Sequence, residues 1–122
     1  MRPRHPLVLV VEDDEAVRTP LEKFLRLQGF EVMSAITADE ALDLIAARRP
    51  DAAVVDLRLP QGSGRDVIVS IPPPAPVIIF SAVPNDADGL ERLRPNTRLI
   101  LKPFSLMMLV ETIKRMLGDA DV

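Results

Sequence analysis

The chain has 122 residues and a formal net charge of −3, with 48% hydrophobic and 27% charged residues and no cysteine. This length and composition predict a single folded domain and exclude a largely disordered chain, a disulfide framework and thiol chemistry. The negative net charge does not indicate a basic surface for binding nucleic acid. No stretch is apolar enough to span a membrane, and none resembles a secretory signal. We therefore expect a cytoplasmic protein.

Short apolar runs recur along the chain and predict strands. The run Leu7–Val11 predicts a strand that is buried on both faces, and residues 52–55, 77–80 and 99–101 predict the same. Residues 30–35 are more mixed, as expected for a strand at the edge of a sheet. Short apolar runs without alternation are typical of a parallel sheet covered by helices on both sides.

The first predicted helix follows the first strand. The apolar spacing over residues 17–25 predicts an amphipathic helix that ends near Gly29. Pro20 lies within this pattern and is expected to distort the helix without ending it. Much later, the proline run at 72–76 should end the third helix early and form a stiff, extended connector.

Two other helices carry signals at their ends. Thr37 predicts an N-cap, with Glu40 placed to complete a capping box. The clearest helix spans residues 106–117; Ser105 should cap it, and it should stop before Gly118. The full pattern is βα repeated five times, which predicts an α/β fold with a doubly wound, five-stranded parallel sheet.

Polar residues follow four of the buried strands. In such sheets, sites form beyond the carboxyl ends of the strands, so these side chains are expected to converge on one edge. Three are acids, one is a hydroxyl and one is a lysine: Glu12, Asp13, Asp56, Ser81 and Lys102.

The charges of this group predict its chemistry. Carboxylates about 5 Å apart repel by roughly 3 kcal/mol at an effective dielectric constant near 20, so the cluster must either raise a pKa or bind a cation. Oxygen ligands suit Mg²⁺. A carboxylate flanked by Mg²⁺ and a lysine ammonium can attack a phosphoryl group and form an aspartyl phosphate.

Each residue also has an ordinary structural explanation when it is taken alone. Acids after a strand favour the positive end of a helix, a serine is commonly a cap, and a lysine is commonly on the surface. Their joint placement at four strand ends favours a site. His5, which has no such placement, is expected to be a surface residue.

The motifs resemble those of the receiver domain of two-component response regulators over nearly the whole chain. The matching segments are residues 10–14, 54–60 with Gly64, 80–82 and 101–104. The resemblance implies a flavodoxin-like (βα)5 fold with strand order 2-1-3-4-5. It also implies a single receiver domain over residues 1–122, with an ordered core at about 6–118.

The resemblance implies a metal-dependent phosphoacceptor site. Asp56 would be the phosphoacceptor. Asp13 and Asp56 would contact Mg²⁺ directly, Glu12 would act through water, and the backbone carbonyl of Arg58 would be a further ligand.

Other positions are implied by the same resemblance. Ser81 and Lys102 would bond oxygens of the phosphoryl group, and the Lys102–Pro103 peptide would be cis. Leu99 occupies the switch position where the family usually has Tyr or Phe, which puts the usual aromatic switch in doubt. Val83 offers no polar group to orient a water, so we expect a long-lived phosphoryl group.

The implied donor is a sensor histidine kinase or a histidine phosphotransfer protein. Phosphorylation would draw Ser81 inward and bias a surface on the fourth helix, fifth strand and fifth helix, for an effector or a second copy of the chain. The domain would catalyse its own modification without being a conventional enzyme.

Three alternatives remain open at this point. The first is a scaffold or interaction domain of the same fold that is never phosphorylated. The second is a phosphohydrolase, which would need an Asp-x-Asp pattern that residues 12–14 lack. The third is a nucleotide-binding fold, which Gly62 and Gly64 support only weakly.

Overall fold

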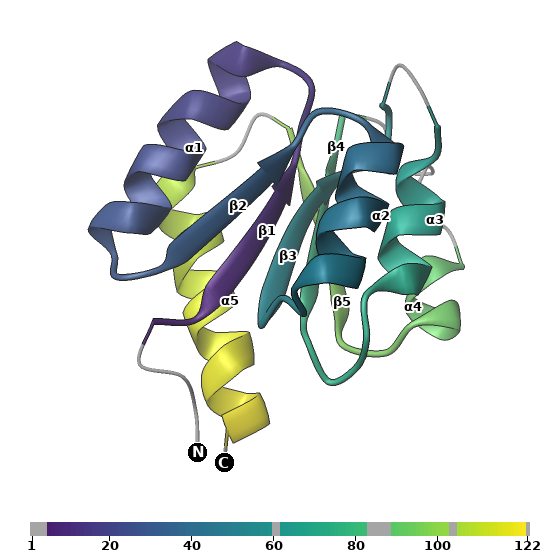
Figure 1. Ribbon diagram of the computed structural model, residues 1–122. Coiled ribbons are helices and arrows are strands. Elements are labelled where there is room, and N and C mark those ends of the chain that lie inside the picture. Colours follow the sequence, from purple (N-terminus) through teal and green to yellow (C-terminus); the bar gives the residue numbers. More distant parts are fainter. Residues whose placement is uncertain (1–4, 60–61, 83–88, 103–104, 122) are drawn as a thin grey trace.

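The computed structural model describes residues 5–59, 62–82, 89–102 and 105–121. Five strands form one sheet in the predicted order β2-β1-β3-β4-β5 (Figure 1). The strands are β1 (Leu7–Val11), β2 (Glu31–Ala35), β3 (Ala52–Asp56), β4 (Val77–Ser81) and β5 (Thr97–Leu101). All neighbouring strands are parallel, so their carboxyl ends share one edge of the sheet.

Helices cover both faces of this sheet, as the doubly wound prediction requires. One face carries α1 (Glu15–Leu27) and α5 (Leu106–Asp121) (Figure 1). The other carries α2 (Ala38–Ala47), α3 (Gly64–Ser70) and the short α4 (Leu90–Leu93). Within the described ranges, no helix is both long and apolar enough to cross a membrane.

The central strands supply an apolar core to each face. Val8 and Val10 of β1 pack with α1 and α5, whereas Leu9 and Val11 pack with α2 and α3. Every residue of β1, β3 and β4 is buried. Burial on both faces explains why these strands appear in the sequence as continuous apolar runs.

Three details of the prediction are wrong. The fifth strand was expected to be buried on both faces, but Leu101 is 45% exposed. Leu101 is exposed because β5 lies at the sheet edge, where less of its surface is covered. The strand also begins at Thr97, two residues before its predicted start. The last helix does not stop before Gly118 but continues to Asp121, since one glycine costs a helix only about 1 kcal/mol relative to alanine.

The C-terminal end of α1 follows the predicted signal, and a polar cap begins the helix. Asp14 is its N-cap, and the Asp14 carboxylate accepts a hydrogen bond from the backbone N–H of Ala16 at 2.9 Å. The helix continues through Pro20, as expected. Gly29 follows the C-cap with a φ of +95°, a conformation that favours glycine.

Polar caps also begin α2 and α5. The Thr37 hydroxyl accepts a hydrogen bond from the Glu40 N–H at 3.1 Å. The Glu40 carboxylate accepts one from the N–H of Ile36 at 3.0 Å, one residue before the cap, so the predicted capping box is displaced by one position. Ser105 accepts a hydrogen bond from the Met108 N–H at 3.3 Å, which confirms it as the cap of α5.

The proline connector at 72–76 is held by side chains from outside it. The buried guanidinium of Arg94 donates to the carbonyls of Ile71 and Ala75, and Asn96 donates to a carbonyl of the connector at 3.0 Å. The third helix ends at Ser70, before the prolines, as predicted. The connector is therefore fixed at the edge of the sheet opposite the strand carboxyl ends.

Candidate functional site

Strand pairing brings the predicted site residues to one edge of the sheet. β1 lies beside β3, β3 beside β4, and β4 beside β5. The backbone N–H of Glu12 donates to the Ala35 carbonyl at 3.1 Å, and that of Lys102 donates to the Ser81 carbonyl at 2.9 Å. These bonds continue the sheet pattern just past the ends of β1 and β5, so the positions that follow the strands are fixed as well.

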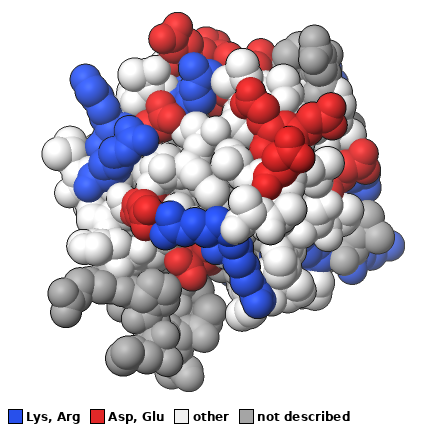
Figure 2. Space-filling model, viewed as in Figure 1, with Lys and Arg blue, Asp and Glu red and all other residues white. Residues whose placement is uncertain are grey.

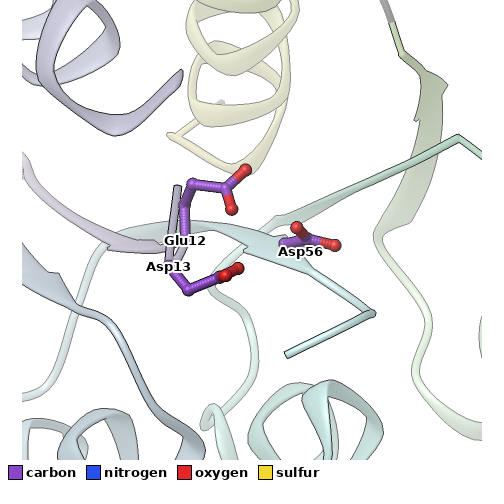
Figure 3. A group of neighbouring side chains, drawn as sticks. All are labelled: Glu12, Asp13 and Asp56. Atoms are coloured by element: carbon purple, nitrogen blue, oxygen red, sulfur yellow. The ribbon is translucent and has the colours of Figure 1, made fainter. Parts of the chain in front are cut away.

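Three carboxylates from two strands gather at this edge. Glu12 and Asp13 come from the end of β1 and Asp56 from the end of β3, and one oxygen of each lies within 4.8 Å of the others (Figure 3). Glu12 is fully buried and Asp56 is nearly so, whereas Asp13 is exposed. The spacing agrees with the separation of about 5 Å that underlay the prediction of a charged cluster.

Lys102 joins this cluster from the fifth strand. Its ammonium donates to Oε1 of Glu12 and to Oδ2 of Asp56, each at 3.0 Å. The same ammonium lies 4.8 Å from the centre of the Phe80 ring, a cation–π contact that the sequence did not indicate. Lys102 is thus held between two acids and an aromatic face.

The backbone around Asp56 is closely packed. Oδ1 of Asp56 accepts a hydrogen bond from the Arg58 N–H at 2.9 Å. A Cβ atom on Gly64 would lie 2.6 Å from the Asp56 carbonyl oxygen and 2.8 Å from the Cα of Leu57, so only glycine fits there. Both carboxylate oxygens of Asp56 therefore have a donor, and the start of α3 packs directly against the strand end.

Burial and charge shift two pKa values in the cluster. Burial raises the pKa of Glu12 from 4.5 to about 7, against the effect of hydrogen bonds from the Asp14 N–H and Lys102. The neighbouring charge of Asp56 raises it further. Burial acts to lower the pKa of Lys102, but its hydrogen bonds to Glu12 and Asp56 outweigh burial and leave that pKa above its usual value. The cluster favours either a proton on Glu12 or an additional cation.

The donor set fits a divalent cation. When ionised, the three carboxylates exceed the charge of the Lys102 ammonium by two. Oxygen ligands that lie about 2.1 Å from an octahedral Mg²⁺ are about 3 to 4 Å from one another. The three carboxylate oxygens of this cluster lie within 4.8 Å of one another, which is slightly farther apart. Small side-chain adjustments would bring two carboxylates into direct contact with the ion. The acidic cluster can therefore bind a metal.

The remaining predicted residues differ in how far the structure describes them. Ser81 is buried at the end of β4. Leu99 is half-buried on β5 and packs with the core beneath α3 and α4. Val83 and the Lys102–Pro103 peptide involve residues outside the described ranges. His5 is exposed, as expected.

A family model described as the response regulator receiver domain matches residues 8–114. The transcriptional regulatory protein PrrA of Mycobacterium bovis is 38% identical over 116 residues, which cover 92% of this chain and 50% of that protein. The response regulator MprA of Mycolicibacterium vanbaalenii is 35% identical over 114 residues, which cover 90% and 49%. The chain thus spans about half the length of the curated relatives it matches.

Solved structures show the same similarity. The signal receiver domain of a putative Luxo repressor protein from Vibrio parahaemolyticus superimposes with a TM-score of 0.81 at 25% identity, covering 96% of this chain and 93% of that one. The receiver domain of a sensor histidine kinase from Pseudomonas aeruginosa, solved with a magnesium ion in its active-site cleft, gives 0.77 at 25% identity, with coverages of 93% and 98%.

Proposed function

The chain belongs to the response regulator receiver domain family, and on this ground we propose that Asp56 accepts a phosphoryl group from a histidine kinase or a histidine phosphotransfer protein. In this reaction an oxygen of Asp56 forms a bond to phosphorus while the bond from phosphorus to the histidine nitrogen breaks. The histidine nitrogen keeps the electron pair of that bond. We take residues 1–122 as a single receiver domain that acts in the cytoplasm.

The observation that carries this proposal is the convergence of Asp56 and Lys102. Their contact at 3.0 Å holds an ammonium beside the carboxylate that would attack. The transition state spreads negative charge over the phosphoryl oxygens, and a positive group fixed in advance stabilises that charge without reorganisation. Ser81, buried at the neighbouring strand end, would bond another phosphoryl oxygen.

Asp13, Asp56 and the backbone carbonyl of Arg58 would hold Mg²⁺, with Glu12 acting through water. Bound there, the ion would supply positive charge to the phosphoryl oxygens. The surplus of negative charge in the cluster supports this assignment, because Lys102 offsets only one of three acids. Oxygen ligands at partly exposed positions such as Asp13 also suit an ion that keeps several waters.

We further propose that the modified domain presents a surface on α4, β5 and α5 to an effector or to a second copy. Leu101, Met107 and Met108 are 45%, 57% and 49% exposed at the end of β5 and the start of α5. Exposed apolar side chains of this kind mark contact sites, and methionine adapts to varied partners. Ser81 and Leu99 would link the site to this surface, Leu99 without the aromatic ring common in the family.

The proposal is tested by phosphorylation with a small donor. Acetyl phosphate and Mg²⁺ should add one phosphoryl group to the wild-type chain, detected by intact mass, and a chelator should prevent it. Asp56→Asn should remain unmodified. The matched control Asp66→Asn, on the exposed surface of α3, should be modified like wild type. A folded wild-type chain that stays unmodified would instead favour the unphosphorylated scaffold.

A further inference from the structure

Arg18 in the first turn of α1 reaches back to the acid pair. Its Nη1 donates to the backbone carbonyl of Glu12 at 3.0 Å and to that of Asp13 at 3.2 Å. The backbone N–H of Arg18 donates to the Asp14 carbonyl at 2.8 Å, which places the residue firmly at the start of the helix. One guanidinium group thus binds two consecutive peptide groups of the turn between β1 and α1.

The position of the Asp13 carboxylate depends on this turn. Across the described residues, the Glu12 carboxylate is held by the Asp14 N–H and Lys102, but no hydrogen bond holds the carboxylate of Asp13. Asp13 is also exposed, so no packed core fixes it. Its location relative to Asp56 is therefore set by its own backbone, whose carbonyl side is anchored by Arg18.

We propose that Arg18 is a positioning residue that fixes the backbone of residues 12–13 and thereby sets the affinity of the acid cluster for Mg²⁺. This inference rests on the proposed use of the cluster as a magnesium site. Groups that orient the ligands of a metal commonly contribute about ten- to a hundredfold to its affinity. Arg18 would act through Asp13 and would not itself contact the ion.

The charge of Arg18 and its hydrogen bonds to the turn predict opposite effects on Mg²⁺ binding when the side chain is removed. A guanidinium near the cluster repels a cation, so its removal should strengthen Mg²⁺ binding if charge alone mattered. If Arg18 acts by holding the turn, its removal should weaken binding, because Asp13 would spend less time where it can share an ion with Asp56. The sign of the change therefore separates the two effects.

The test measures Mg²⁺ binding by titration calorimetry at a pH above 7, without a phosphodonor. Arg18→Met should weaken binding about tenfold, and Arg18→Lys, which keeps a charged donor, should weaken it less. Arg26→Met, in the last turn of the same helix, should bind like wild type. Unchanged or tighter binding by Arg18→Met would overturn the inference.

A second measurement separates a local role from a general loss of structure. Amide hydrogen exchange at Asp14, whose N–H donates to the Glu12 carboxylate, should accelerate in Arg18→Met, while exchange in β3 and β4 stays as in wild type. If Arg18→Met does not fold, the smaller loss in Arg18→Lys carries the test, and wild-type affinity there would overturn the inference. A wild-type chain that binds no Mg²⁺ would contradict the proposed function itself.

Discussion

Replacing Glu12 with glutamine should change how the stability of the fold depends on pH. Burial raises the pKa of Glu12 from 4.5 to about 7, so between these values the folded chain holds a proton that the unfolded chain has released. The free energy of unfolding must then fall as pH rises through this window. Each pH unit corresponds to about 1.4 kcal/mol, so the full loss is about 3 kcal/mol.

Glutamine cannot ionise, so Glu12→Gln should lack this loss. Relative to wild type, the variant should gain about 3 kcal/mol in unfolding free energy between about pH 4.5 and 8, the range that spans both pKa values. The chain has no Trp or Tyr, so urea unfolding is best followed by far-ultraviolet circular dichroism. A chelator should be present, because a bound cation would itself favour the ionised form of Glu12.

A matched control separates this titration from all others in the chain. Glu111→Gln removes an exposed carboxylate from α5 and should follow wild type across the pH range. The reasoning would be refuted if the difference between Glu12→Gln and wild type stayed constant with pH. It would equally be refuted if wild type gained stability relative to the variant as pH rose, because a buried acid with a raised pKa requires the opposite sign.

Three other substitutions test separate parts of the structure. Gly64→Ala would place a Cβ 2.6 Å from the Asp56 carbonyl oxygen and 2.8 Å from the Cα of Leu57. It should lower the free energy of unfolding in urea by about 1 to 3 kcal/mol and reduce phosphorylation of the chain. Wild-type stability and phosphorylation would contradict the close packing. Arg94→Met leaves two buried carbonyls without their donor and should lower the unfolding free energy by about 2 kcal/mol. An unchanged urea midpoint would show that the hydrogen bonds of Arg94 add nothing to stability. Val83→Glu should shorten the half-life of the phosphoryl group, measured by phosphate release, and an unchanged half-life would count against a role for that position.

The central strands could be predicted because a strand that is buried on both faces consists almost entirely of apolar residues. Residues 7–11 and 77–80 are continuous apolar runs, and both are strands in the structure. The start of the edge strand β5 could not be predicted in this way, because its first two residues, Thr97 and Arg98, are not apolar. The end of α5 was missed because a glycine commonly signals a helix end, whereas its cost inside a helix, about 1 kcal/mol, is small enough for α5 to continue to Asp121.

The convergence of part of the predicted cluster could be foreseen for a related reason. Glu12 and Lys102 follow strands and Asp56 ends one, and a parallel sheet brings such positions together. Arg18 could not be found in this way, because it binds backbone carbonyls, which every residue possesses. The buried Arg94 was missed for the same reason, since its partners are also carbonyls. The roles of Arg58, Ser81 and Leu99 in the reaction stay predictions.

The placement of Lys102 has a consequence for the order in which the domain can assemble. Its partners Glu12 and Asp56 precede it by 90 and 46 residues, on strands that a growing chain completes first. Until the last strand docks, the joined β1 and β3 carry acids without their counter-charge. The docking of β5 beside β4 therefore completes the sheet and also brings a positive charge to Glu12 and Asp56, and a chain that ended before residue 97 would have neither.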